Sequence, residues 1–176
     1  MELTGKKIAL LCEDLFDDQE FIYPLHRMRE EGAEVVIVAP EGGKQYTGKY
    51  GFPVKSDKAA SSVSASDFDA VIVPGGFAPD KMRRDPAMVS LVRETDAQGK
   101  VVAAICHAGW MLVTADIVRG RAVTGFSSLQ VDLRNAGGEF VDREVVQDRN
   151  LITSRAPADL GPFCRAIIKT VAGGGE

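Results

Sequence analysis

Residues 101–109, VVAAICHAG, join a short apolar run to a cysteine, a histidine and two small residues. Five consecutive apolar residues are typical of a strand that is buried on both faces of a sheet. A helix is expected from about residue 107 to residue 118, so it begins where the strand ends. This direct passage from strand to helix predicts one unit of a parallel α/β sheet.

Similar apolar runs stand on both sides of this segment, and helical patterns separate most of them. Strands are expected at 7–12, 34–39, 69–73, 140–146 and 150–153, with a small hairpin within 40–54. Helices are expected at 20–31, 86–98, 127–135 and 158–171. Strands that alternate with helices predict an α/β fold, a mostly parallel sheet with helices on both faces.

The size and composition of the chain fit one globular domain. It has 176 residues, of which 45% are hydrophobic and 26% are charged, so a single domain over 1–176 is expected. No apolar run approaches the roughly 18 residues that span a bilayer, so we expect no membrane partner. The apolar stretch near the N-terminus runs straight into Glu13 and Asp14, which favours a first strand over a signal peptide.

Charge and cysteine content narrow the class of protein further. The net charge is −4, with 21 basic and 25 acidic residues, which gives no support to nucleic-acid binding. The three cysteines, Cys12, Cys106 and Cys164, form no CxxC pair and are typical of a reducing cytoplasmic compartment. Because the chain has two histidines and no phosphate-binding glycine loop, we expect neither a metal nor a nucleotide cofactor.

The carboxyl ends of three expected strands carry residues that suit a binding site. Ligands of such sheets bind at this edge, where the acids of 13–20, the pair Gly75-Gly76 and the pair Cys106-His107 should meet. Cys106 faces the start of a helix, whose dipole lowers the pKa of a thiol and favours the nucleophilic thiolate. The alternative is a small buried hydrophobic residue, which is what we expect of the other two cysteines.

The neighbours of Cys106 each allow two interpretations. His107 could be the base for the thiol or could cap the helix. The Gly75-Gly76 pair could bring backbone N–H groups to an oxyanion or could form a plain turn. The acids of 13–20 either cap the following helix or contact the thiol. The residue types alone leave these alternatives open.

Five longer strings resemble one known family. They are EFIYPLHRMREEGAEV (20–35), VIVPGGFAPD (71–80), AAICHAGW (103–110), NAGGEFVDREVV (135–146) and TSRAPADL (153–160). In this order they are similar to the PfpI-type intracellular protease branch of the ThiJ/PfpI superfamily. The resemblance runs from about residue 7 to residue 168 and implies one ThiJ/PfpI-type domain with a flavodoxin-like three-layer sandwich fold. It also implies a homo-oligomer, either a dimer or a hexamer.

The resemblance further implies a set of site residues. Cys106 matches the nucleophilic cysteine and His107 the adjacent histidine, while Gly76 and the His107 backbone match the donors of oxyanion-type N–H groups. Relatives place a glutamate of the first strand–helix loop beside the thiol, and the alignment puts Asp17 there. Asp80 matches a carboxylate that a neighbouring subunit supplies to the histidine. Both acids are aspartates where the family typically has glutamates.

Together these assignments predict a cytoplasmic, cysteine-dependent stress-response enzyme in which Cys106 attacks an electrophilic carbon. The expected substrates are small electrophiles or peptides, and the reaction is peptide hydrolysis, removal of dicarbonyl adducts or conversion of methylglyoxal to lactate. The alternative is an oxidation-sensing or chaperone-like stress protein in which the same thiol is oxidised and little turnover occurs. A small-molecule-binding domain is a third interpretation, which the absence of a nucleotide fingerprint disfavours.

Overall fold

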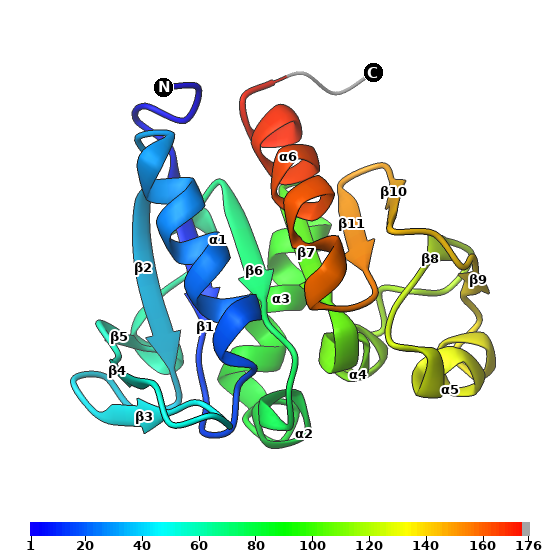
Figure 1. Cartoon of the computed structure of the whole chain (residues 1–176), viewed down its shortest axis with the longest axis horizontal. Helices are drawn as coiled ribbons and strands as arrows, with labels where there is room; N and C mark the ends of the chain where they lie inside the picture. Colours follow the sequence, from blue (N-terminus) through cyan, green and yellow to red (C-terminus); the bar gives the residue numbers. More distant parts are fainter. Residues whose placement is uncertain (174–176) are drawn as a thin grey trace.

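A central seven-stranded sheet lies between two layers of helices in the computed structural model, which describes residues 1–173 (Figure 1). The last three residues of the expected 1–176 domain lie outside this range. In chain order the strands are β1 (Lys7–Leu11), β2 (Glu34–Ala39), β5 (Lys58–Ala59), β6 (Ala70–Val73), β7 (Val101–Ile105), β10 (Val145–Asp148) and β11 (Leu151–Ser154). The strand order is β10-β11-β7-β6-β1-β2-β5, and only the β10–β11 pair is antiparallel.

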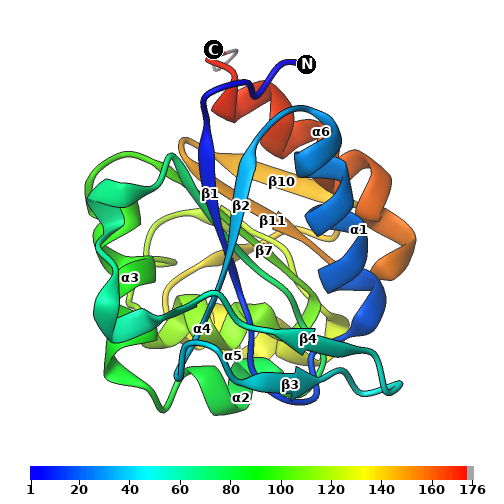
Figure 2. The ribbon, with the colours of Figure 1, turned by 90° about the vertical axis from the view of Figure 1, so that its left-hand side faces the viewer.

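Helices cover both faces of this sheet (Figure 2). They are α1 (Asp18–Glu30), α2 (Ala78–Met82), α3 (Pro86–Ala97), α4 (Gly109–Thr114), α5 (Gln130–Asn135) and α6 (Leu160–Val171). Helices α1 and α6 pack against each other on one face, while α3 and α4 contact each other and β7 on the opposite face. The predicted flavodoxin-like three-layer sandwich is confirmed. Within residues 1–173, no helix has both the length and the apolar character that crossing a bilayer requires.

The core forms where the apolar periodicity predicts it. All five residues of β7 and all four of β6 are buried, as expected of parallel strands covered on both sides. On α1 the buried apolar face includes Phe21, Leu25 and Met28, which are spaced three or four residues apart. Asp17 and Asp85 each accept two backbone N–H groups and so fix where α1 and α3 begin.

Two expected elements depart clearly from the sequence pattern. The helix expected over 107–118 ends at Thr114, because Asp116 adopts a left-handed conformation with φ of 56° that no α-helix accommodates. The strand expected over 140–146 is wrong as one element. Its first residue belongs to β9 (Glu139–Phe140), which pairs with β8 (Ala122–Val123) in a separate two-stranded sheet, and β10 begins only at residue 145.

The carboxyl ends of β1, β6 and β7 lie at one edge of the sheet and bring the candidate residues together. A bridge between Phe16 and Gly76 links the loops that follow β1 and β6. The expected hairpin is present as β3 (Gln45–Thr47) paired with β4 (Pro53–Lys55), and it lies at this end of the molecule, away from the N-terminus (Figure 2). The fold therefore places three loops and a hairpin around one small region.

Candidate active site

Cys106 occupies a strained position directly after β7. Its φ is +61°, a left-handed conformation that costs a residue with a Cβ about 1–2 kcal/mol. The short turn Cys106–Ala108 then leads into α4. Strain of this kind persists only where the surrounding structure enforces it, and it is concentrated at functional sites. The side chain is 7% exposed, whereas Cys12 is fully buried.

Two backbone N–H groups point at the Cys106 sulfur. They belong to His107 and Gly76, and both lower the pKa of the thiol. Gly76 has φ of +79°, and a Cβ at this position would lie 2.8 Å from the carbonyl carbon of Phe16. Only glycine fits here without displacing the loop. The structure thus brings Gly76 and the His107 backbone together at the thiol, where the resemblance places them.

The acid beside the thiol is Glu20, from the first turn of α1. Its side chain is fully buried, and its Oε2 accepts a hydrogen bond of 2.8 Å from the Gly75 backbone N–H. A Cβ on Gly75 would meet both this carboxyl group and the Cβ of Cys106, at 2.8 Å from the latter. Among residues 1–173, no hydrogen-bond partner reaches the buried Oε1 atom of Glu20. That oxygen can therefore carry a proton.

The environment of Glu20 favours its protonated form. Burial and the nearby charge of Asp17 raise its pKa to about 7, against smaller lowering effects of the Gly75 N–H, the Cys106 thiol and Lys49. A carboxyl group with a pKa near 7 can donate and accept protons at neutral pH. Glu20 thus has the property of a general acid and base.

The expectation that Cys106 has a lowered pKa is wrong for the state in which Glu20 is ionised. Burial and the Glu20 charge raise the pKa of Cys106 to about 12, and the His107 and Gly76 N–H groups offset this only in part. Two negative groups in one buried pocket repel each other, so the thiol and the carboxyl group titrate as a pair. At neutral pH the thiolate therefore forms only if a base takes the thiol proton or if Cys106 and Glu20 share one proton.

The prediction that Asp17 lies beside the thiol is wrong. Asp17 is the N-cap of α1, and its Oδ1 accepts the backbone N–H groups of Gln19 (3.0 Å) and Glu20 (3.2 Å). Its Oδ2 lies 2.7 Å from Nζ of Lys49. α1 begins two residues earlier than expected, so Asp17 stays at the cap and Glu20 reaches the thiol. Asp17 acts on the site indirectly, because its charge raises the pKa of Glu20.

His107 folds back over the thiol, with Nδ1 3.2 Å from the sulfur of Cys106. Its Nε2 lies 3.4 Å from Oγ of Ser128, and its ring stacks on Phe126 with a centroid distance of 4.7 Å and contacts the edge of Trp110. Burial and the charge of Lys49 lower the pKa of His107, so the ring is neutral at pH 7. With its proton on Nε2, the ring can accept the thiol proton at Nδ1.

Asp80 lies on α2, where its side chain is exposed. Within residues 1–173, no hydrogen bond or ion pair joins its carboxylate to His107. The predicted contribution of Asp80 to a neighbouring subunit therefore stays a prediction.

Comparison with known proteins identifies the family to which this arrangement belongs. The DJ-1/PfpI family matches residues 6–170. The chain belongs to the DJ-1/PfpI family. This confirms the resemblance to the PfpI-type branch, whose relatives share the sequence along nearly the whole chain.

Curated relatives carry enzyme names. The chain is 45% identical over 161 residues to "Putative cysteine protease YraA" of Bacillus subtilis, with 92% of this chain and 95% of the relative covered. It is 44% identical over 163 residues to "Deglycase PH1704" of Pyrococcus horikoshii, with 93% and 98% covered. Among solved structures, DJ-1beta of Drosophila melanogaster matches with a TM-score of 0.89 and 30% identity, over 96% of this chain and 91% of that chain. The chain is thus a PfpI-type enzyme of the DJ-1/PfpI family.

Sequence reasoning missed two contributors to this DJ-1/PfpI site. Glu20 stands three residues after the cap Asp17, and an Asp-x-x-Glu spacing at a helix start could have marked both. Lys49 comes from the turn of the β3–β4 hairpin, far from the site in sequence, and no local signal points to it.

Replacing Glu20 with Gln should remove a pH dependence of stability. The folded pKa of about 7 exceeds the ordinary value of 4.5, so the folded state holds a proton that the unfolded state releases between these values. The wild type should therefore lose about 2 kcal/mol of unfolding free energy between pH 5 and pH 8, relative to Glu20→Gln. Urea unfolding at both pH values measures this difference. An equal pH dependence in the two proteins would contradict the buried, proton-holding Glu20.

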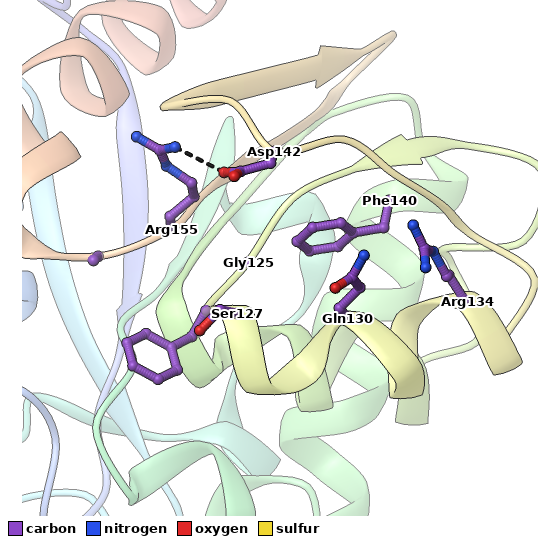
Figure 3. A pocket seen from close by; sticks show the side chains of 9 residues that line it. Gly125, Ser127, Gln130, Arg134, Phe140, Asp142 and Arg155 are labelled. Atoms are coloured by element: carbon purple, nitrogen blue, oxygen red, sulfur yellow. Dashed lines mark hydrogen bonds and ion pairs between the residues drawn. The ribbon is translucent and has the colours of Figure 1, made fainter.

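A cavity of 380 Å³ lies beside the candidate site (Figure 3). Phe126, which stacks on His107, also lines this cavity. Figure 3 shows Gln130 and Arg134 on one side of it and Arg155 with its ion-pair partner Asp142 on another. The cavity provides space for a chemical group close to His107.

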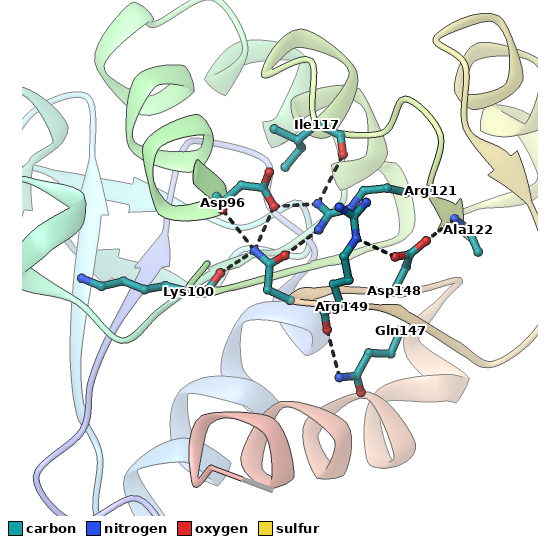
Figure 4. A network of polar contacts seen from close by, with 9 residues as sticks. Asp96, Lys100, Ile117, Arg121, Ala122, Gln147, Asp148 and Arg149 are labelled. Atoms are coloured by element: carbon teal, nitrogen blue, oxygen red, sulfur yellow. Dashed lines mark hydrogen bonds and ion pairs between the residues drawn. The ribbon is translucent and has the colours of Figure 1, made fainter. Parts of the chain in front are cut away.

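A second polar cluster lies at the opposite edge of the sheet (Figure 4). The buried Arg121 is paired with Asp96 at 2.6 Å. The Asn150 side chain donates to the Asp96 carboxylate at 2.9 Å and to the Lys100 carbonyl at 2.8 Å. Lys100 and Asn150 directly precede β7 and β11, so this network fixes the amino ends of two strands. No group of three or more metal-binding side chains occurs in the part of the chain that the structure describes.

Proposed function

We propose that this chain is a cysteine-dependent deglycase-type hydrolase in which Cys106 is the nucleophile. The observation that carries the proposal is the buried Glu20 carboxyl group, with a pKa of about 7, beside a thiol at a strained strand–helix junction. The names of the relatives, deglycase and cysteine protease, both support chemistry at a carbonyl carbon.

The surroundings of Cys106 suit each proton transfer in such a reaction. His107 accepts the thiol proton at Nδ1, which lies 3.2 Å from the sulfur. The N–H groups of His107 and Gly76 stabilise negative charge on the sulfur or on an oxygen attached to the attacked carbon. Glu20 moves a proton between the atoms of the bound intermediate, for which its pKa is well matched.

A dicarbonyl adduct of an amine can be removed by these steps. The thiol displaces the amine from the adduct R–NH–CH(OH)–CO–CH₃, so that an S–C bond forms, the C–N bond breaks and the amine leaves with a proton. The resulting hemithioacetal rearranges to a thioester of lactate. Glu20 takes the proton from the carbon bonded to sulfur and returns a proton to the neighbouring carbon, while the hydroxyl proton moves from one oxygen to the other. Water then hydrolyses the thioester, which releases lactate and restores the thiol.

A panel of substrates tests this proposal. The protein is incubated with the methylglyoxal adduct on the side-chain amine of Nα-acetyl-lysine, with free methylglyoxal and with unmodified peptides, and the release of lactate, amine and cleaved peptide is measured. Release of amine and lactate from the adduct supports the proposal. Cleavage of peptides alone, or no turnover together with selective peroxide oxidation of Cys106, would overturn it in favour of a peptidase or an oxidation sensor.

The proposal includes a cytoplasmic homo-oligomer with a shared site. Its support is the exposed position of Asp80 on α2 and the environment of His107 Nε2, which in residues 1–173 contacts the Ser128 hydroxyl and no carboxylate. Three free cysteines agree with a reducing compartment. In a dimer or hexamer, Asp80 of one subunit would orient His107 of the next.

Combining two impaired variants in one oligomer tests the shared site. Asp80→Ala should lower turnover about 10- to 100-fold by leaving His107 without its orienting carboxylate. Hybrid oligomers of Asp80→Ala and Cys106→Ser subunits combine an intact thiol from one subunit with an intact Asp80 from the other. Co-expressed hybrids should therefore regain activity above that of either parent. Hybrids as inactive as their parents, or a monomer in sedimentation, would contradict the shared site.

A further inference from the structure

The turn of the β3–β4 hairpin is fixed against the start of α1. The buried carboxylate of Asp18 accepts the backbone N–H groups of Tyr50 (3.0 Å) and Phe52 (2.9 Å). The N–H of Lys49 donates to the Phe16 carbonyl at 2.9 Å. The backbone of Lys49 is thereby held beside the loop that bridges to Gly76, at the edge of the candidate site.

The side chain of Lys49 forms an ion pair in which the lysine is the more exposed partner. Its Nζ lies 2.7 Å from Oδ2 of Asp17, and the side chains are 25% and 4% exposed, respectively. The other oxygen of Asp17 is already used by two backbone N–H groups of α1. The Lys49 ammonium group is therefore the more accessible partner of the pair, whereas the Asp17 carboxylate is almost fully buried.

This positive charge acts on both sides of the thiol. Lys49 influences Glu20 and also His107, and these two residues flank Cys106 on different elements of the fold. In both cases the ammonium charge lowers the pKa of the affected group. At Glu20 the charge of Asp17 outweighs it, whereas at His107 Lys49 is the only charge that acts. Water screens distant charges, so a charge that acts on both residues lies near the site.

We infer that Lys49 is a specificity-determining residue that favours substrates with an anionic group, a carboxylate or a phosphate, next to the reacting carbon. The inference rests on the proposed function for its meaning in turnover, but the accessible ammonium group of Lys49 at the edge of the site exists independently of it. Substrates of this class are adducts and carbonyl compounds that retain a free acid group.

Alkylation of Cys106 tests the charge preference without any turnover. Iodoacetate and iodoacetamide form the same S–C bond with loss of iodide and differ in charge, so their rate ratio reports the potential at the thiol. Mass spectrometry measures both rates at Cys106. The rate with iodoacetate relative to the rate with iodoacetamide should fall about three- to tenfold in Lys49→Met. Lys49→Arg should retain most of it. Lys55→Met, an exposed lysine of the same hairpin, should leave it unchanged.

Turnover provides the second measurement. The methylglyoxal adducts of N-acetylcysteine and of its amide release a thiol, with its proton, in place of the amine. They differ only in a carboxylate, and Lys49→Met should raise KM for the acid form several-fold with little change for the amide. If neither adduct is turned over while the alkylation ratio falls as expected, the proposed function fails and the charge preference stands. If the alkylation ratio is the same in Lys49→Met as in the wild type, the inference about Lys49 is overturned.

Discussion

Replacing Cys106 with Ser should lower kcat/KM for the dicarbonyl adduct at least 10³-fold. Serine has nearly the same size, and the site should keep its backbone N–H groups, Glu20 and His107. The loss arises because a hydroxyl group is a far weaker nucleophile than a thiol and is not activated by the same base. Kinetics of purified wild type and variant at several adduct concentrations measure the effect.

Cys164→Ser is the matched control. Cys164 lies on α6 and is 1% exposed, and it has no part in the site. Its replacement should change kcat/KM no more than about threefold, although stability falls because a hydroxyl group is buried. Comparable activity in Cys106→Ser and the wild type would exclude Cys106 as the nucleophile.

Replacing Gly75 with Ala should reduce activity at least 100-fold in a protein that still folds. The added Cβ would contact the Glu20 carboxyl group and would lie 2.8 Å from the Cys106 Cβ and 3.0 Å from the Ile105 carbonyl oxygen. The two reacting groups must then separate. Overpacking of this kind costs about 1–3 kcal/mol of stability, and a displacement near 1 Å costs a catalytic site about 10²-fold.

Thermal unfolding and kcat/KM of Gly75→Ala separate these two effects. Gly161→Ala is the control, because a Cβ there would meet only the Arg165 side chain at 3.4 Å on the surface of α6. It should retain full activity with unchanged or higher stability. Near wild-type activity in Gly75→Ala would contradict the close packing of Glu20 and Cys106.

The sheet could be predicted because its signals are local. Buried strands read as uninterrupted apolar runs, and β1, β2, β6 and β7 begin within one residue of their expected positions. The small β8–β9 sheet could not be predicted, because each strand has only two residues and their pairing depends on the tertiary fold. The helix after Cys106 was overestimated because the apolar pattern continues past the point where the backbone turns at Asp116.

The site residues that could be predicted are those whose positions follow from the strand that precedes them. Cys106 and Gly76 require a sharp turn, and their positions follow from the strand ends. The choice between Asp17 and Glu20 depended on where α1 begins, since a shift of two residues decides which acid faces the thiol. The pKa of Cys106 could not be predicted because it depends on burial and on a charge from another element. Lys49 reaches the site only through the hairpin.

Labelling of the three cysteines in the native protein tests the central claim, that Cys106 is the reacting group, most directly. Iodoacetamide is applied at pH 7.5 with and without the dicarbonyl adduct, and mass spectrometry follows each cysteine over time. Cys106 should be labelled first and should be protected by the adduct, while Cys12 and Cys164, both almost fully buried, should react only on unfolding. Labelling of Cys12 or Cys164 as fast as Cys106, or labelling of Cys106 that the adduct does not slow, would contradict the account.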